Sequence, residues 1–299
     1  MSDIGGQAVI EGVMMRSGNA WTVAVRNSDN EIVLKKERAK ELPKPLKLPV
    51  LRGVVALVQA LSIGISALLF SAEASGLDEE KPSSLSLALT VAFSFAAGIG
   101  LFLFLPLYAT KLMGALLASI NESSLVFNLV DGVIRVAVFL LYVVLISMNK
   151  DIKRVFQYHG AEHKAVHAFE AGVELTPLNT DNYSTVHPRC GTSFLIMVML
   201  LSIMVFSLIP KEWPFIYKFL SRIALMPLIA GLSYEFIKFS SKKMNNPFVR
   251  VLAMPGLWLQ RLTTGAPSHD QIEVAVRALK EVLEMDPGHK GKRGTGTDV

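Results

Sequence analysis

The apolar and polar positions divide this chain into a polar start, a long apolar middle and a polar end. Five apolar segments fill the middle, at residues 53–72, 85–109, 125–148, 192–210 and 214–237. A transmembrane helix needs about 20 consecutive, mainly apolar residues. The last four segments meet this length; 85–109 and 192–210 carry no charge, whereas 125–148 contains Asp131 and Arg135 and 214–237 contains Lys218, Arg222 and Glu235. The pattern therefore predicts a mainly α fold, a polytopic helical membrane bundle of about four spans.

The first apolar segment has a different pattern. Within 53–72, the polar residues Gln59, Ser62 and Ser66 fall on one helical face, and Glu73 continues it. Such a helix fits the membrane interface or a re-entrant position as well as a span. If it does not cross, the basic N-terminus, the 149–191 loop and the C-terminal tail all lie on one side. The positive-inside rule then makes that side cytosolic, so we expect four spans and cytosolic termini.

Residues 1–50 have the pattern of a small β-unit. Apolar and polar residues alternate over 21–26 and 32–36, and Ser28, Asp29 and Asn30 between them favour a turn. Pro43, Pro45 and other prolines then predict a stiff, basic linker. We define 1–50 as the first domain and 51–245 as the membrane domain, which includes the 149–191 loop.

The third domain, residues 246–299, begins with an interfacial segment around Trp258. Ser268 is a good N-cap for an amphipathic helix that runs to about Met285. The tail after Gly288, rich in glycine and lysine, has the composition of a disordered segment.

Composition agrees with a membrane protein. Hydrophobic residues make up 51% of the chain and charged residues only 18%, whereas soluble domains carry about 25% charged residues. The net charge of +5 sits beside the apolar segments, so we expect the lipid bilayer as partner and no nucleic acid. The chain could also bind a second copy of itself and form a homo-oligomer. The single cysteine, Cys190, excludes an intrachain disulfide and favours a reducing compartment.

The strongest candidate for chemistry is the sequence His159-Gly160-Ala161-Glu162-His163, which has the form H-x-x-E-H. Histidines at positions i and i+4 of a helix point the same way and can share one metal ion. Glu162 could then accept a proton from a water molecule that the metal activates. His167 and Glu170 continue the same face as additional candidates. A solvated polar face is the alternative interpretation.

A second group, His187 and Cys190, stands in a Pro-Gly turn before the 192–210 segment. Histidine and cysteine three residues apart could supply half of a zinc site, although a lone cysteine is more often a small buried residue. Nitrogen and thiolate ligands favour Zn²⁺ or another divalent transition metal over Mg²⁺ or Ca²⁺. We therefore expect His159, His163, His187 and Cys190 as metal ligands.

Other charged residues have two interpretations each. Glu235, near the end of the last span, is either a distant ligand or an interfacial carboxylate paired with a cation. Asp131 and Arg135, four apart within a span, are expected to pair with each other or to line a polar path. Glu11 and Arg16 either support the metal ligands or hold the β-unit together.

Four stretches resemble the YqhQ-like family of bacterial membrane proteins of unknown function, often labelled predicted metal-dependent enzymes. They are GGQAVIEGVMMR at 5–16, YHGAEHK at 158–164, HPRCGT at 187–192 and PGLWLQRLTT at 255–264. The resemblance covers nearly the whole chain and implies a bacterial inner (cytoplasmic) membrane. The family label itself derives from the histidines, so it adds no independent indication of catalysis.

Three functions fit these patterns. A metal-dependent hydrolase with Glu162 as general base requires an open coordination position and is the first expectation. A scaffold or assembly protein with a structural zinc site requires all four ligands on the metal and comes second. A transporter or channel lined by Asp131, Arg135 and Glu235 comes last, because the paired broken helices typical of transporters are absent from the sequence.

Overall fold

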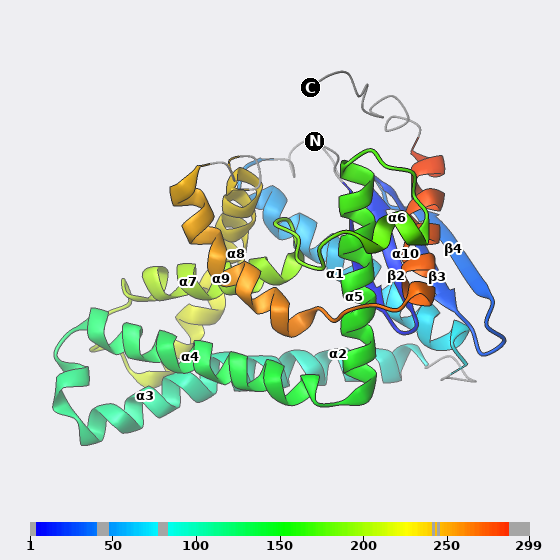
Figure 1. Cartoon of the computed structure of the whole chain (residues 1–299). Helices are drawn as coiled ribbons and strands as arrows, with labels where there is room; N and C mark the ends of the chain where they lie inside the picture. The colour runs from blue at the N-terminus through cyan, green and yellow to red at the C-terminus, as the bar shows by residue number, and fades with distance from the viewer. Residues whose placement is uncertain (1–3, 41–47, 77–82, 241–242, 244–245, 287–299) are drawn as a thin grey trace.

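The computed structural model describes residues 4–40, 48–76, 83–240, 243 and 246–286 (Figure 1). The chain is mainly helical with a small N-terminal antiparallel sheet, as predicted. The strands are β1 (Ile4–Val9), β2 (Gly12–Ser17), β3 (Ala20–Arg26) and β4 (Ile32–Arg38). The α-helices are α1 (Leu51–Ala74), α2 (Ser84–Ile99), α3 (Leu105–Leu116), α4 (Ser124–Ser147), α5 (Lys150–Glu170), α6 (Pro177–Asp181), α7 (Gly191–Phe206), α8 (Phe215–Ser240), α9 (Pro247–Thr263) and α10 (His269–Met285). Two short helices complete the list, the π-helix η2 (Gly100–Phe104) and the 3-10 helix η3 (Ala118–Asn121).

The sheet has the strand order β1-β2-β3-β4, twice the number of strands that the sequence predicted. The predicted strands are β3 and β4. The sequence did not predict β2, because five of its six residues are buried. A strand buried on both faces lacks the alternation of apolar and polar residues that indicates a strand. β1 carries Gly5 and Gly6, which disfavour strands, and Glu11 has a positive φ of 50° in the turn that follows.

Both faces of the sheet are covered, which explains why its central strands are buried. Val13, Met15 and Ala24 face one side and pack with α5 and α10. Met14, Trp21 and Val25 face the other side and pack with Ile63 and Ala67 of α1. The first and last described parts of the chain therefore share one hydrophobic core. Ser268 and Gln271 form a capping box at the start of α10, which confirms the predicted start of that helix.

Four helical stretches are long and apolar enough to cross a membrane: Leu51–Ala74, Ser84–Leu116, Ser124–Ser147 and Phe215–Ser240. The second of these joins α2, η2 and α3 and extends past the predicted end at residue 109. α4 and α8 match the predicted spans closely. Many large apolar side chains on these helices are exposed, including Phe93 at 76% and Val133 at 61%, as expected of lipid-facing surfaces.

The third predicted span, 192–210, is the part that differs. Its helix, α7, ends at Phe206 and has 16 residues, so its length is about 24 Å at 1.5 Å per residue. That is shorter than a hydrocarbon core of about 30 Å. The chain leaves the helix at Ser207 and reaches α8 through a turn that contains Pro210 and Pro214.

α5 runs across the direction of α4 and stands beside the sheet (Figure 1). It therefore joins the apolar helices to the unit formed by the sheet and α10. Two predicted segments lie outside the described residues. They are the part of the linker that contains Pro43 and Pro45, and the tail from residue 287 onward.

Candidate metal centre

The histidines of α5 occupy the face that is left after the helix packs on the sheet. The N-cap of α5 is Asn149, whose side chain accepts hydrogen bonds from the N–H groups of Asp151 and Ile152. Tyr158, Ala161 and Ala165 then pack into the core beneath the sheet. Positions 159, 163 and 167 share another face because they are four residues apart. The rings of His159 and His163 are 4.4 Å apart, centre to centre.

Each of the first two histidines has one ring nitrogen held by a backbone carbonyl. His159 Nδ1 lies 2.8 Å from the carbonyl oxygen of Thr263, and His163 Nδ1 lies 2.5 Å from that of Thr185. A carbonyl can only accept, so Nδ1 is the protonated nitrogen in both rings. The lone pair of each Nε2 is then available to a metal. This is the usual arrangement of metal-binding histidines, in which the second nitrogen is fixed by a hydrogen bond.

Cys190 supplies a third candidate ligand at the same point. Its Sγ lies 3.2 Å from His159 Nε2. The residue is the N-cap of α7, and Sγ accepts a hydrogen bond from the Thr192 N–H at 3.4 Å. The N-terminus of a helix favours negative charge, which suits a thiolate ligand. One ligand atom from each of His159, His163 and Cys190 lies within 4.8 Å of the others.

His187 belongs to a different group. With His167 and Glu170 it forms a second cluster whose ligand atoms also lie within 4.8 Å of one another. The structure thus divides the four predicted ligands between two groups. The reason is the orientation of the His187 ring: Nδ1 accepts a hydrogen bond from the Arg189 N–H at 3.2 Å, and Nε2 lies 3.4 Å from Glu170 Oε2.

The second group is less suited to a metal. Glu170 forms an ion pair with Arg189, which neutralises its charge. Both ring nitrogens of His187 are occupied, Nδ1 by the Arg189 N–H and Nε2 by Glu170. His167 Nε2 lies 2.9 Å from the Val186 carbonyl oxygen. Burial lowers the pKa of His167 and of His187. These contacts fix the 186–189 turn against α5 and explain why the second group is already saturated by protein partners.

Glu162 is buried beside the first group. Its exposed fraction is 5%, and its Oε2 lies 3.5 Å from His163 Nε2. The carboxylate lies over β1, where Gly6 makes room for it: a Cβ atom at Gly6 would come within 2.7 Å of Glu162 Cγ. The predicted general base is thus close to the nitrogen of His163 that a metal would use.

Three other predicted site residues lie elsewhere. Glu235 pairs with a cation, as one of its two interpretations expected, and that cation is Arg52 of α1. Glu11 pairs with Arg154 and accepts a hydrogen bond from the Tyr158 hydroxyl at 3.2 Å. Arg16 donates to Gln59 of α1 at 2.7 Å. Glu11 and Arg16 therefore attach the β-unit to α5 and α1.

Asp131 and Arg135 form the predicted ion pair, within a larger cluster. Arg222 of α8 donates to Asp131 Oδ1 at 2.6 Å and to Asn128 Oδ1 at 2.7 Å. Arg135 also donates to Ser202 Oγ of α7 at 2.6 Å. The cluster thus joins three helices among otherwise apolar residues.

Sequence reasoning missed several residues that position these groups. Gly6 stands only within the 5–16 motif of the sequence analysis, and its contact with Glu162 depends on a fold that spacing does not give. Gly160 has a similar role, because a Cβ atom there would clash with the carbonyl oxygen of Gly265, just after the Thr263 carbonyl that holds His159. Arg222 could have been identified as a third charge within a span.

Two comparisons bear on identity. Residues 48–285 match the family described as "Protein of unknown function (DUF1385)". The chain is also 36% identical to "Uncharacterized protein YqhQ" of Bacillus subtilis (strain 168), over 94% of this chain and 92% of that protein. No solved structure matches the chain.

Proposed function

The chain belongs to the DUF1385 family, whose function is unknown, and we propose that it is a membrane-embedded, metal-dependent hydrolase. The observation that carries the proposal is the set of three ligands, His159, His163 and Cys190, with the buried carboxylate of Glu162 beside it. Catalytic zinc sites hold the metal with three protein ligands and leave the fourth position open, whereas structural sites use four.

The donor atoms of this group fit Zn²⁺. Two imidazole nitrogens and one thiolate are borderline-soft ligands, which zinc accepts and which magnesium and calcium do not. The carbonyls of Thr263 and Thr185 orient the two rings. A bound zinc ion would supply Lewis acidity and lower the pKa of a coordinated water molecule.

Glu162 has the position of a general base. Its carboxylate can accept a proton from the attacking water molecule and later donate it to the leaving group. Burial keeps bulk water away from it, and Gly6 lets β1 approach closely enough to hold it. The substrate class remains open among peptides, lipids and phosphoesters.

The proposed location is the bacterial inner membrane, with the metal centre and both termini on the cytosolic side. The second half of α1 covers the sheet through Ile63 and Ala67, which argues that this helix lies at the interface and does not cross. The proposed spans are then α2–α3, α4 and α8, together with α7, which is shorter than the hydrocarbon core and would cross it where the bilayer is thinned. Their cytosolic ends carry Lys150, Lys153 and Arg154, in agreement with the positive-inside rule.

A scaffold with a structural zinc site is the second candidate. The observation in its favour is that the ligands come from two elements: α5 provides the histidines and the start of α7 provides Cys190. A metal here would fasten the 177–190 segment to α5. This function requires a fourth protein ligand, and His187 would have to leave its contacts with Arg189 and Glu170 to supply it.

Glu162→Gln separates the two functions. Zinc content and hydrolysis of fluorogenic peptide, phospholipid and phosphoester substrates are measured on the full-length protein in detergent. We expect the variant to keep its zinc and to lose roughly 10²–10⁴-fold in rate, because the amide cannot accept a proton. His163→Ala should lose both zinc and activity, and His269→Ala, a histidine on the exposed face of α10, should lose neither.

The proposal is wrong if Glu162→Gln hydrolyses substrate as fast as the wild type, or if zinc-free protein does so. A protein that binds zinc tightly but hydrolyses none of the three substrate classes would favour the scaffold.

A further inference from the structure

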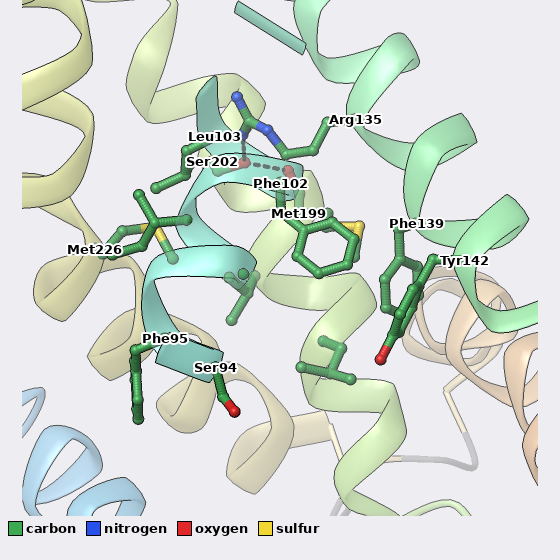
Figure 2. Close-up of a pocket in the computed structure, with 14 residues that line it drawn as sticks. Ser94, Phe95, Phe102, Leu103, Arg135, Phe139, Tyr142, Met199, Ser202 and Met226 are labelled. Carbon is green, nitrogen blue, oxygen red and sulfur yellow. Dashed lines mark hydrogen bonds between the residues drawn. The ribbon is translucent and has the colours of Figure 1, made fainter. Parts of the chain in front are cut away.

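A second site lies between the apolar helices, away from the metal centre. It is a cavity of about 510 Å³, within the range of roughly 300–1,000 Å³ typical of small-molecule sites. The walls come from α2, η2, α4, α7 and α8 (Figure 2). Phe102, Phe139, Tyr142 and Met199 form much of the lining, which is almost wholly apolar. Such a lining fits a hydrocarbon chain.

One end of the cavity is polar. Figure 2 shows Arg135 and Ser202 together at one end, and Ser94 and Phe95 at the other. The seven helical steps from Leu195 to Ser202 on α7 correspond to about 10 Å of helix, so the cavity is elongated. An elongated apolar cavity with a guanidinium at one end has the shape and polarity of an amphiphile.

The charges around Arg135 leave the polar end positive. Arg135 and Arg222 contribute two positive charges and Asp131 one negative charge, so the cluster has a net charge of +1. Arg135 is 4% exposed and Arg222 is 1% exposed. In the described part of the chain, the Nε atoms of both arginines are buried without a hydrogen-bond partner. Buried charges are normally paired, so this cluster lacks one anionic acceptor.

The entrance lies on an apolar surface. Phe95 and Leu195 line the cavity and are 55% and 42% exposed. No residue of α2 is buried, and the π-helix η2 places Phe102 and Leu103 in the cavity wall. A ligand that enters between α2 and α7 therefore comes from an apolar phase.

We propose that this cavity binds a lipid-derived amphiphile with one acyl chain, whose anionic head group pairs with Arg135. The chain fills the apolar part, and the oxyanion accepts a hydrogen bond from the Arg135 guanidinium, which Ser202 Oγ orients by accepting from it at 2.6 Å. This proposal is independent of the metal centre. A free fatty acid and a lysophospholipid both have this chemistry, and the experiment distinguishes them.

Two glycines provide a matched pair of variants. Gly98 lines the cavity, and Gly100 does not, yet a Cβ atom at either position meets nothing within 4 Å. Gly98→Leu should therefore fill the cavity, and Gly100→Leu should leave it empty. Arg135→Gln removes the charge, but it also disturbs Asp131, so the glycine pair provides the decisive comparison.

The experiment measures binding of radiolabelled oleate to the full-length protein in phosphatidylcholine nanodiscs. Oleoyl lysophosphatidate, neutral monooleoylglycerol and inorganic phosphate serve as competitors. We expect saturable oleate binding that Gly98→Leu abolishes and Gly100→Leu preserves. Arg135→Gln should weaken it at least about tenfold, the scale of a lost charged hydrogen bond. Whichever of oleate and lysophosphatidate binds more tightly identifies the source of the ligand.

Three outcomes would overturn the proposal. They are unchanged oleate binding by Gly98→Leu, competition by monooleoylglycerol equal to that by unlabelled oleate, and displacement of oleate by inorganic phosphate alone.

Discussion

The metal centre and the arginine cluster both bury polar groups, but they favour ligands of opposite charge. At the metal centre, His159 and His163 each use one nitrogen for a backbone carbonyl, and the other nitrogen faces Cys190 or Glu162. In the cluster, Asp131 is shared between two arginines, and the positive charge exceeds the negative. The first arrangement offers lone pairs to a cation, and the second offers donors to an anion. Neighbouring contacts, more than residue type, decide what a buried polar group can bind.

The comparison between the two histidine groups gives the largest expected effect. His163→Ala should remove bound zinc, because it takes away one of three ligands. His187→Ala should retain zinc with at most a roughly 10–100-fold loss of affinity, the scale for residues that act through a ligand. Zinc content after dialysis against a weak chelator measures both. If His187→Ala loses zinc as completely as His163→Ala, a single four-ligand site replaces the division into two groups.

The arginine cluster predicts a large loss of stability. Asp131→Asn removes the one negative charge and leaves two buried arginines without an ionic partner. Breaking a buried ion pair costs roughly 3–5 kcal/mol. Unfolding by heat or denaturant in detergent measures the free energy of unfolding. The control is Asp29→Asn, in an exposed turn, whose free energy of unfolding should stay within about 0.5 kcal/mol of the wild type. A loss of stability no larger than that of Asp29→Asn would show that another anion compensates the arginines.

A smaller effect is expected at the contact between β1 and the general base. Gly6→Ala places a Cβ atom against Glu162 and the Met14 carbonyl oxygen, whereas Gly5→Ala meets nothing within 4 Å. Overpacking typically costs about 1–3 kcal/mol. We expect Gly6→Ala to lose stability and hydrolysis while it keeps zinc, and Gly5→Ala to keep all three. Equal behaviour of the two variants in the unfolding and zinc assays would contradict the close approach of Glu162 to β1.

The sequence predicted the elements whose patterns are local. α4 follows from a long, mainly apolar run, and α10 from a capping residue and helical periodicity. β2 was missed because a strand buried on both faces does not alternate, and its second cover, α1, is distant in sequence. The end of α7 at Phe206 was missed because Leu208 and Ile209 continue the apolar segment after the helix ends.

The candidate site shows the same limit. The spacing of His159 and His163 follows from helix geometry, so their proximity could be predicted. The side on which the 187–190 turn meets α5 could not, because it depends on Gln260 of α9. That side chain accepts from the His187 N–H at 2.8 Å and donates to the His187 carbonyl at 2.9 Å. The contact between Arg222 and Asp131 could not be predicted either, because helix spacing indicates only partners within the same helix and Arg222 lies on another one.

The central claim is that His159, His163 and Cys190 form a metal centre with an open position. X-ray absorption at the zinc edge of the purified, zinc-loaded protein tests it most directly. We predict two nitrogen ligands and one sulfur ligand from the protein, at about 2.0–2.1 Å and 2.3 Å, and one light ligand that added small anions replace. A shell without sulfur, or one with three histidine nitrogens and a sulfur that added anions do not change, would contradict the account.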